Sequence, residues 1–385
     1  MVTRIFAPEP SAASLRLEAL ARALSKVADV TILTTLPPGD VHDAEADGTD
    51  IRRWPVLRDR SGYVRGYLQY MSFDLPLLLR VLFGRRADVY VCEPPPTTGA
   101  VVRIAAKLRR RPYVYYAADI WSDAAQATSA PRFIVRILAA MERFAMRGAD
   151  ALLVVTPGVE SRVHDLAPGR YVRVVGHGVD LSTFAPDGET VPAPADIVYV
   201  GSASEWHGAS VAMEAVIRVL ERDPLLTAAF IGQGSEWSQL RDLAARSSVN
   251  SRVRFLDTVP AERAADWLRS ARVAVATLAP AQGYDFAVPT KLYAAVAVGT
   301  PVAYAGPDPV RGIINRDRLG VGVDHDAVSL ADAVSQVLTE DFEDERDRLV
   351  RWAEDNVSAE RVAERATAAI VAIADGSQGA TQVPH

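Results

Sequence analysis

The stretch "YVGSASEWHGASVAMEAV", residues 199–216, decides the fold class, because it predicts a short apolar strand, a turn at Gly201 and the start of a helix. Glycine permits a tight turn after a strand, and a helix that starts near Gly208 would offer free N–H groups to a phosphate. The stretch "FIGQGSEW", residues 230–237, repeats the arrangement one unit later. Such turns are common in α/β folds, but two of them in one domain favour nucleotide binding.

Short apolar runs alternate with helix-period segments along the whole chain, which predicts parallel sheets built from βαβ units. Strands are expected at residues 2–7, 29–35, 88–93, 112–119, 151–156, 197–202, 227–234, 253–259, 273–278 and 301–306. Helices are expected at 13–27, 98–111, 132–147, 208–221, 235–246, 261–270, 329–338 and 343–374. The fold class is therefore α/β, with two Rossmann-like domains whose parallel sheets face each other across a cleft, the usual ligand site in such architectures.

The expected domain boundaries follow from composition. Residues 1–182 form an N-terminal domain, and residues 183–196, rich in Pro, Asp and Gly, form a linker. Residues 197–345 form a second domain. Residues 346–374 form a C-terminal helix that packs back toward the first domain, and residues 375–385 form a disordered tail.

Chain length, cysteine content and charge limit the possible functions. A chain of 385 residues is too long for one compact core, and its single cysteine, Cys92, fits a reducing cytoplasm. The N-terminus lacks a signal-peptide pattern, and no apolar run reaches the length of a membrane span. The net charge is −6, yet residues 1–180 carry 24 Lys+Arg against 19 Asp+Glu. This excess is either chance or the mark of an anionic partner for that half alone.

Lysine is rare in this chain, and one of its three lysines lies in "PTKLYAAVAVGTPV", residues 289–302. Pro289 and Thr290 are expected to start a helix, with Thr290 as its cap. Lys291 then lies in the first turn, where a cation opposes the helix dipole unless an anion is bound nearby. A phosphate-binding lysine is therefore favoured over a solvated surface lysine.

In the first domain, polar residues fall at the edge expected to face the cleft. Asp119 and Trp121 follow the strand at 112–119, where the structural alternative is a helix-capping Asp beside a partly buried Trp. Arg16 could meet an anion, or could be an ordinary surface arginine. Small residues that permit close approach of a ligand precede it, namely Pro10, Ser11 and Ala12.

The histidines, the metal-binding motifs and the nucleophile motifs decide which other kinds of site are expected. His207 could touch a phosphate as a neutral donor or as a cation, and His177 lies near the linker. The sequence has no cysteine pair, no HExxH motif and no nucleophile elbow, so neither a metal site nor a covalent mechanism is expected. No nucleic-acid partner is expected either.

These pieces in this order resemble a family-4 retaining glycosyltransferase of the GT-B fold, over about residues 2 to 372. The resemblance is closest to the bacterial branch that builds surface polysaccharides and O-antigens. It rests on "FAPEPSAASLRLEALARAL", on a Pro-Pro turn followed by a strand that ends in Asp-x-Trp, on "GHGVD" before "FAP", and on the ordered motifs of the second domain. Each motif is weak alone, and their series is specific.

The chain departs from the family pattern at several places. The Arg and Lys of the family's phosphate turn fall on Ser202 and His207, and its two glutamates, eight residues apart, fall on Phe286 and Ala294. The second glutamate normally accepts hydrogen bonds from the nucleotide ribose, so its loss would cost about 1.5–3 kcal/mol. The lysine is retained as Lys291.

The resemblance implies a metal-independent transfer from a nucleotide-sugar, with a UDP-sugar slightly favoured and no cofactor. The implied donor-binding residues are Gly201, Ser202, His207, Gly232, Gly234, Asp257, Val259, Phe286, Pro289, Thr290, Lys291 and Ala294. The implied acceptor-side residues are Pro10, Ser11, Ala12, Arg16 and Trp121, and Asp119 is the candidate catalytic group.

Two other functions remain open: a noncatalytic GT-B protein that binds a nucleotide-sugar or glycan, and a sugar-nucleotide epimerase of GT-B fold. The acceptor is a glycan, a lipid-linked sugar or a small molecule. Residues 65–86 mix aromatic and aliphatic side chains with arginines that include Arg85 and Arg86. They form either a helix at the inner face of the membrane or a hairpin, broken at Pro76, that packs on the sheet.

Overall fold

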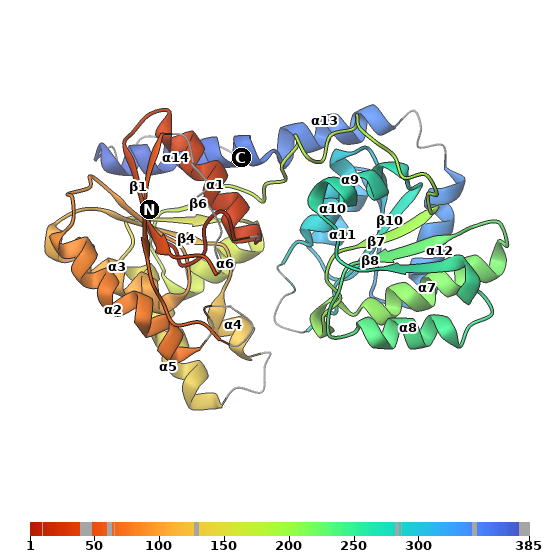
Figure 1. The fold of residues 1–385 in the computed structure, drawn as a ribbon, viewed down its shortest axis with the longest axis horizontal. Coiled ribbons are helices and arrows are strands. Elements are labelled where there is room, and N and C mark those ends of the chain that lie inside the picture. Colours follow the sequence, from red (N-terminus) through yellow and green to blue (C-terminus); the bar gives the residue numbers. More distant parts are fainter. Residues whose placement is uncertain are drawn as a thin grey trace. The chain divides into compact units, whose positions relative to one another are not determined.

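The computed structural model describes residues 1–9, 11–38, 48–59, 64, 66–126, 131–281, 285, 287–340 and 345–376. The chain forms two compact units, unit 1 (Met1–Gly178 and Ala359–His385) and unit 2 (Val179–Ser358). Each unit is a parallel sheet with helices packed on it (Figure 1). The predicted fold class, α/β with two Rossmann-like domains, is confirmed.

The sheet of unit 1 is assembled from two parallel pieces, β1–β2 and β3–β4–β5–β6. Val2 joins them, because it bridges Leu33 of β1 on one side and Cys92 of β3 on the other. The strand predicted at residues 2–7 is therefore wrong beyond this bridge, since the Thr3 hydroxyl bonds the Ile5 carbonyl and bends the chain. The strands are β1 (Val30–Thr35), β2 (Thr49–Trp54), β3 (Tyr90–Cys92), β4 (Tyr113–Ala117), β5 (Ala151–Val154) and β6 (Val172–Val174).

The helices of unit 1 are α1 (Ala12–Ser25), α2 (Tyr67–Phe83), α3 (Pro96–Arg109), α4 (Trp121–Gln126), α5 (Arg132–Arg147), α6 (Pro157–Leu166) and α14 (Ala359–Ala374). Pro76 lies inside α2 and does not divide it, so the hairpin expected as one alternative is absent there. α14 packs against α1, which ties the end of the described chain to unit 1 (Figure 1). No helix in the described ranges is long and apolar enough to cross a membrane.

The sheet of unit 2 has the strand order β12-β11-β10-β7-β8-β9. Because the order reverses direction between β7 and β10, a ligand site is expected beyond the carboxyl ends of these two strands. The strands of unit 2 are β7 (Ile197–Val200), β8 (Ala228–Ile231), β9 (Val253–Leu256), β10 (Val273–Thr277), β11 (Val302–Ala305) and β12 (Gly320–Val323). Of these, β7, β8, β10 and β11 are buried and rich in Val and Ala, as burial on both faces requires.

The helices of unit 2 are α7 (Ala209–Arg222), α8 (Trp237–Ala245), α9 (Ala261–Ser270), α10 (Thr290–Ala297), α11 (Val310–Arg316), α12 (Ala327–Thr339) and α13 (Arg346–Asn356). Two short 3₁₀ turns lie at Glu205–His207 and Asn250–Arg252.

Two segments differ from the sequence-based boundaries. The single helix expected over residues 346–374 is two helices, and the first of them, α13, packs against α10 within unit 2. The segment 183–196 also belongs to unit 2, because the Arg269 side chain binds the carbonyls of Ala185 and Glu189 at 3.1 and 2.5 Å. These long-range bonds attach the expected linker to α9.

Candidate functional site

The two glycine turns of unit 2 are in direct backbone contact. Gly201 follows β7 and Gly232 follows β8, with φ angles of 114° and 141° that disfavour other residues. A Cβ on Gly232 would lie 2.1 Å from the Gly201 carbonyl oxygen, and a Cβ on Gly234 would lie 2.1 Å from that of Ala203. Only glycine therefore permits this packing, which continues the β7–β8 pairing into the two loops.

Lys291 is held against the first of these turns. It lies in the first turn of α10, and its Nζ donates to the Tyr199 hydroxyl at 2.9 Å and to the Ser202 carbonyl at 3.0 Å. The ammonium also lies 4.0 Å from the centre of the Tyr199 ring. The lysine, the Gly201 turn and the end of β7 thus form one cluster at the sheet edge where the strand order reverses, and we call it the Lys291 cluster.

The electrostatics of Lys291 are unusual for a lysine. The side chain is half-buried, and this burial lowers its pKa to about 7. No carboxylate among the described residues forms an ion pair with it. An ammonium has three donors, and the two bonds above use two of them. The remaining N–H and the uncompensated charge suit an anionic ligand.

His207 is neutral in this structure. Burial, followed by the neighbouring Lys291 charge, lowers its pKa to about 3. Its Nδ1 accepts a hydrogen bond from the Ser204 N–H at 3.1 Å, so the ring proton belongs on Nε2. Of the two roles considered for this histidine, the lowered pKa favours the neutral donor, and contact with a phosphate stays a prediction. Only 3% of the residue is exposed, so it mainly shapes the turn beneath the ligand site.

The helix start expected to bind phosphate is partly occupied. The Ala209 N–H, the first of α7, donates to Glu236 Oε2 at 2.9 Å. Desolvation raises the pKa of Glu236, and the bond from Ala209 opposes the rise. A carboxylate at this helix end repels a phosphate, so the expectation of a free N–H cradle near Gly208 is wrong at its first position. Lys291 is the stronger anion site.

The other predicted donor-side residues have mixed surroundings. Pro289 is buried and is the N-cap of α10, so Thr290 is not the cap that the sequence suggested. Ala294 lies one turn beyond Lys291 and is only 7% exposed, within the apolar core of unit 2. Phe286 lies outside the described residues, so its predicted role stays a prediction.

Asp257 and Val259 follow β9, two strands away from β7. The Asp257 side chain is 97% exposed, with its Oδ1 at 3.8 Å from Arg241 Nη2, and Val259 is half-buried. They share the carboxyl edge of the sheet with Gly232 and Gly234, and no recorded contact links them to Lys291. Their predicted role beside a nucleotide base stays a prediction.

In unit 1, two of the predicted residues, Arg16 and Asp119, are electrostatic neighbours. Arg16 of α1 pairs with Glu93 at the end of β3, so the arginine is not free to serve as an isolated anion site. Asp119 is solvent-exposed. Desolvation by neighbouring groups raises the pKa of its carboxyl, and the nearby Arg16 charge opposes that rise. His177 is neutral there, because desolvation, followed by Arg16, lowers its pKa to about 4.

Trp121 begins α4 and is fixed by a residue that sequence analysis missed. Its backbone N–H and that of Ser122 donate to the buried Glu142 carboxylate at 2.7 and 3.0 Å. Glu142 therefore caps α4, so Asp119 does not have to be the cap. The Trp121 ring packs edge-on against Tyr70, with centroids 6.3 Å apart.

Two of the small residues predicted on the acceptor side, Ser11 and Ala12, form the start of α1. The Ser11 hydroxyl accepts from the Ser14 N–H at 3.0 Å and caps α1. Ala12 is the first residue of that helix. Pro10 lies outside the described residues.

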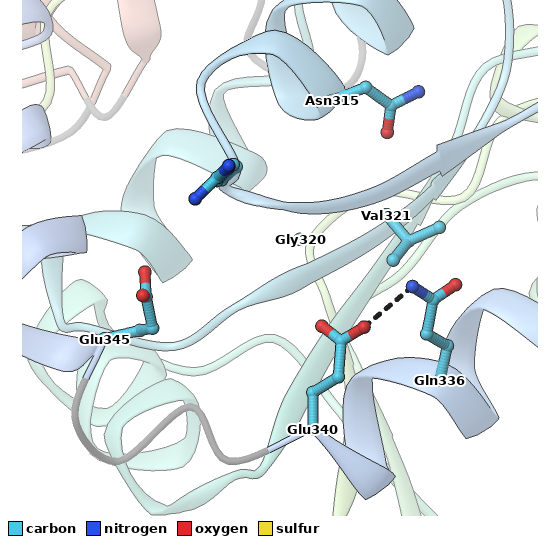
Figure 2. A pocket seen from close by; sticks show the side chains of 7 residues that line it. Asn315, Gly320, Val321, Gln336, Glu340 and Glu345 are labelled. Carbon is cyan, nitrogen blue, oxygen red and sulfur yellow. Dashed lines mark hydrogen bonds between the residues drawn. The ribbon is translucent and has the colours of Figure 1, made fainter.

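A separate pocket of unit 2 lies at the opposite edge of the sheet (Figure 2). Gly320, the first residue of β12, lines it together with Arg318 and Asn315. The Gln336 side chain donates to Glu340 at 2.8 Å across its wall. Because it borders the amino end of β12, this pocket is distinct from the Lys291 cluster at the carboxyl edge.

Comparisons with known proteins agree with this architecture. The description "Glycosyl transferase 4-like domain" matches residues 11–178, and "Glycosyl transferases group 1" matches residues 194–340. A D-inositol 3-phosphate glycosyltransferase 2 of Catenulispora acidiphila is 32% identical over 246 residues, 58% of this chain and 55% of the relative. One of Corynebacterium efficiens is 29% identical over 50% of this chain and 49% of the relative. The chain spans about half the length of the curated relatives it matches.

Solved structures share the fold. Anabaena HepE, in complex with UDP and glucose, has a TM-score of 0.69 at 15% identity over 96% of this chain and 98% of that one. WaaG, described as a glycosyltransferase involved in lipopolysaccharide biosynthesis, has a TM-score of 0.67 at 16% identity, with 96% and 98% covered. Fold and family models together define the class, a GT-B glycosyltransferase. The two models together cover most of the chain and assign it to family 4, which confirms the family named from the sequence, whereas the retaining mechanism and the surface-polysaccharide branch stay predictions.

Proposed function

We propose that this protein is a retaining glycosyltransferase that moves a sugar from a nucleotide-sugar to a hydroxyl of a glycan, a lipid-linked sugar or a small molecule. The observation that carries the proposal is the Lys291 cluster, where a half-buried cation without a recorded carboxylate partner meets a glycine turn at the β7–β10 switch point. A diphosphate matches this charge and its remaining donor.

In the proposed reaction, the Lys291 ammonium stabilises the charge that develops on the departing diphosphate. It takes the part that a divalent cation has in metal-dependent transferases, so no metal is invoked. Asp119 is the proposed hydrogen-bond partner of the acceptor hydroxyl, and either its carboxylate or the departing phosphate oxygen takes the proton. The sugar leaves the phosphate oxygen and bonds to the acceptor oxygen on the same face of the ring.

UDP is the proposed nucleotide, because a fold neighbour, Anabaena HepE, was solved with UDP and with UDP-glucose. The proposed compartment is the cytoplasm, which the lone buried cysteine favours. The surface-polysaccharide branch is likewise a proposal that rests on the sequence motifs. Buried Ala294 and the Glu236 carboxylate beside α7 favour weak donor binding, and they keep a noncatalytic binding protein as the second candidate.

Thermal-shift screening against UDP-, GDP-, dTDP- and ADP-sugars tests the proposal. We expect one nucleotide to raise the melting temperature of the wild type and of Lys26→Ala, a matched exposed lysine in unit 1. Lys291→Ala should bind the same nucleotide at least about tenfold more weakly, equivalent to about 1.4 kcal/mol. Equal affinity of the two variants would reject Lys291 as the diphosphate ligand.

A further inference from the structure

Exposed apolar side chains are concentrated on three neighbouring helices of unit 1. Eleven of the nineteen large apolar side chains exposed in the described part of the chain lie on α2, α3 and α5, and only two lie in unit 2. α3 packs against both α2 and α5, so the three helices form one surface (Figure 1). We call it the α2–α3–α5 face. Its apolar members are Tyr67, Leu68, Leu75, Leu79, Phe83, Ile104, Leu108, Phe133, Ile134, Ile137 and Phe144.

On α5 the exposed residues are sorted into two parallel stripes. Arginines recur at spacings of four, seven and four residues, which places them along one side of the helix. Apolar residues start one position further along and recur at spacings of four, three and four residues, which gives an adjacent stripe. The arginine stripe is Arg132, Arg136, Arg143 and Arg147, and the apolar stripe is Phe133, Ile137, Ala140 and Phe144. Phe133 is 62% exposed and Ile137 is 55% exposed, so neither packs in the core.

The exposed charged side chains on the helices of this face are all positive. The fully described helices α2, α3 and α5 carry eight Lys and Arg residues and only two acids, Asp74 and Glu142, which are both fully buried. Within the described chain, no ion pair is recorded for Arg132, Arg136 or Arg143. An apolar stripe flanked by uncompensated arginines suits the boundary between lipid tails and anionic headgroups. Two copies of this chain joined through the face would bring like charges together.

We propose that the α2–α3–α5 face docks on an anionic lipid bilayer, with Phe133 and Ile137 in the acyl boundary and the arginine stripe on the headgroups. The face is connected to the predicted acceptor side: Tyr70 of α2 packs on Trp121, and Glu142 of α5 holds the Trp121 N–H. The inference rests on the proposed function for one point only, that docking presents a lipid-linked acceptor to this edge of unit 1.

Vesicle cosedimentation tests the docking itself, without any need for activity. We use the full chain with vesicles of phosphatidylcholine alone, or of about 70% phosphatidylcholine and 30% phosphatidylglycerol. The wild type should pellet with the anionic vesicles at low salt, and at about 0.5 M salt the bound fraction should fall severalfold, since screening weakens the arginine contacts. Phe133→Ser with Ile137→Ser, and separately Arg132→Gln with Arg136→Gln, should each weaken binding about tenfold.

Matched controls lie in unit 2. Leu225→Ser removes a side chain that is 86% exposed, and Arg246→Gln with Arg351→Gln removes the same charge from exposed positions. Both controls should pellet like the wild type. All variants change exposed residues, so circular dichroism melting should be unchanged.

Three results would overturn the proposal: no pelleting at low salt, equal losses in face and control variants, or a dimer in light scattering that Phe133→Ser with Ile137→Ser dissolves. Nucleotide binding is measured on the same samples. Lost docking with retained nucleotide binding rejects the bilayer surface alone, whereas retained docking without nucleotide binding rejects the proposed function alone.

Discussion

Protonation of Lys291 should control nucleotide binding. Burial lowers the pKa of this lysine to about 7 in the free protein, so the ammonium predominates below pH 7 and is lost above it. A bound diphosphate favours the charged form and raises the pKa. If the ammonium strengthens diphosphate binding about tenfold, or by about 1.4 kcal/mol, the pKa of Lys291 is about one unit higher in the complex than in the free protein. Binding near pH 7.5 then takes up about half a proton.

The assay is isothermal titration of UDP into wild type and Lys291→Met from pH 6 to pH 9. The ionisation of UDP itself changes both affinities equally, so it drops out of the ratio of wild-type to variant affinity. The affinity ratio of wild type to variant should fall from about tenfold at pH 6 to about one at pH 9. Repeating the titration in buffers of different ionisation enthalpy gives the proton uptake. A ratio that stays constant with pH, or an uptake that the variant shares, would refute the assignment.

Three further changes are informative. Gly232→Ala would place a Cβ 2.1 Å from the Gly201 oxygen at a φ of 141°, so the free energy of unfolding in urea should fall by more than about 2 kcal/mol. The control Gly169→Ala, with a φ of 73° and open space around it, should lower this free energy by about 1 kcal/mol. Equal losses in the two variants would contradict the packing of the two turns. Glu236→Gln keeps an acceptor for α7 and removes a charge, so UDP should bind about two- to fivefold more tightly in calorimetry, and weaker binding would show that the carboxylate helps the site. Ala294→Glu buries a carboxylate and should cost about 2 kcal/mol in urea unfolding, whereas unchanged stability would mean that this position is open to ligand.

Much of the fold was predictable because both periodicities are strong in this sequence. The helix expected at residues 132–147 is α5 with the same bounds, and β7, β8, β9, β10 and β11 fall within the predicted runs, whereas β12 was not predicted. β2 was missed, since "TDIRRW" has only two apolar residues, Ile51 and Trp54, among polar and charged ones. The expected helix over 346–374 is divided where Val357 and Ser358 pair with Val179, a contact between segments far apart in sequence.

The candidate site was predictable only in outline. Lys291 and Gly201 were selected from local patterns, and the structure brings them together. Tyr199, which holds the lysine, lies 92 residues away in sequence and appeared only as a strand residue. Glu236 was already visible two residues after Gly234 in "FIGQGSEW", but its bond to Ala209 depends on how α7 and α8 pack. Side-chain pairing across the sheet edge is a tertiary property that local periodicity does not encode.

The central claim is that this chain transfers a sugar from a nucleotide-sugar. The most direct measurement is chromatography of UDP-glucose and the other nucleotide-sugars after incubation with the wild type and with Lys291→Met. The account predicts slow release of the nucleoside diphosphate by the wild type, reduced at least about tenfold in the variant, through loss of charge at the leaving group. Conversion of the nucleotide-sugar to an epimer, or tight binding with no release at all, would contradict it.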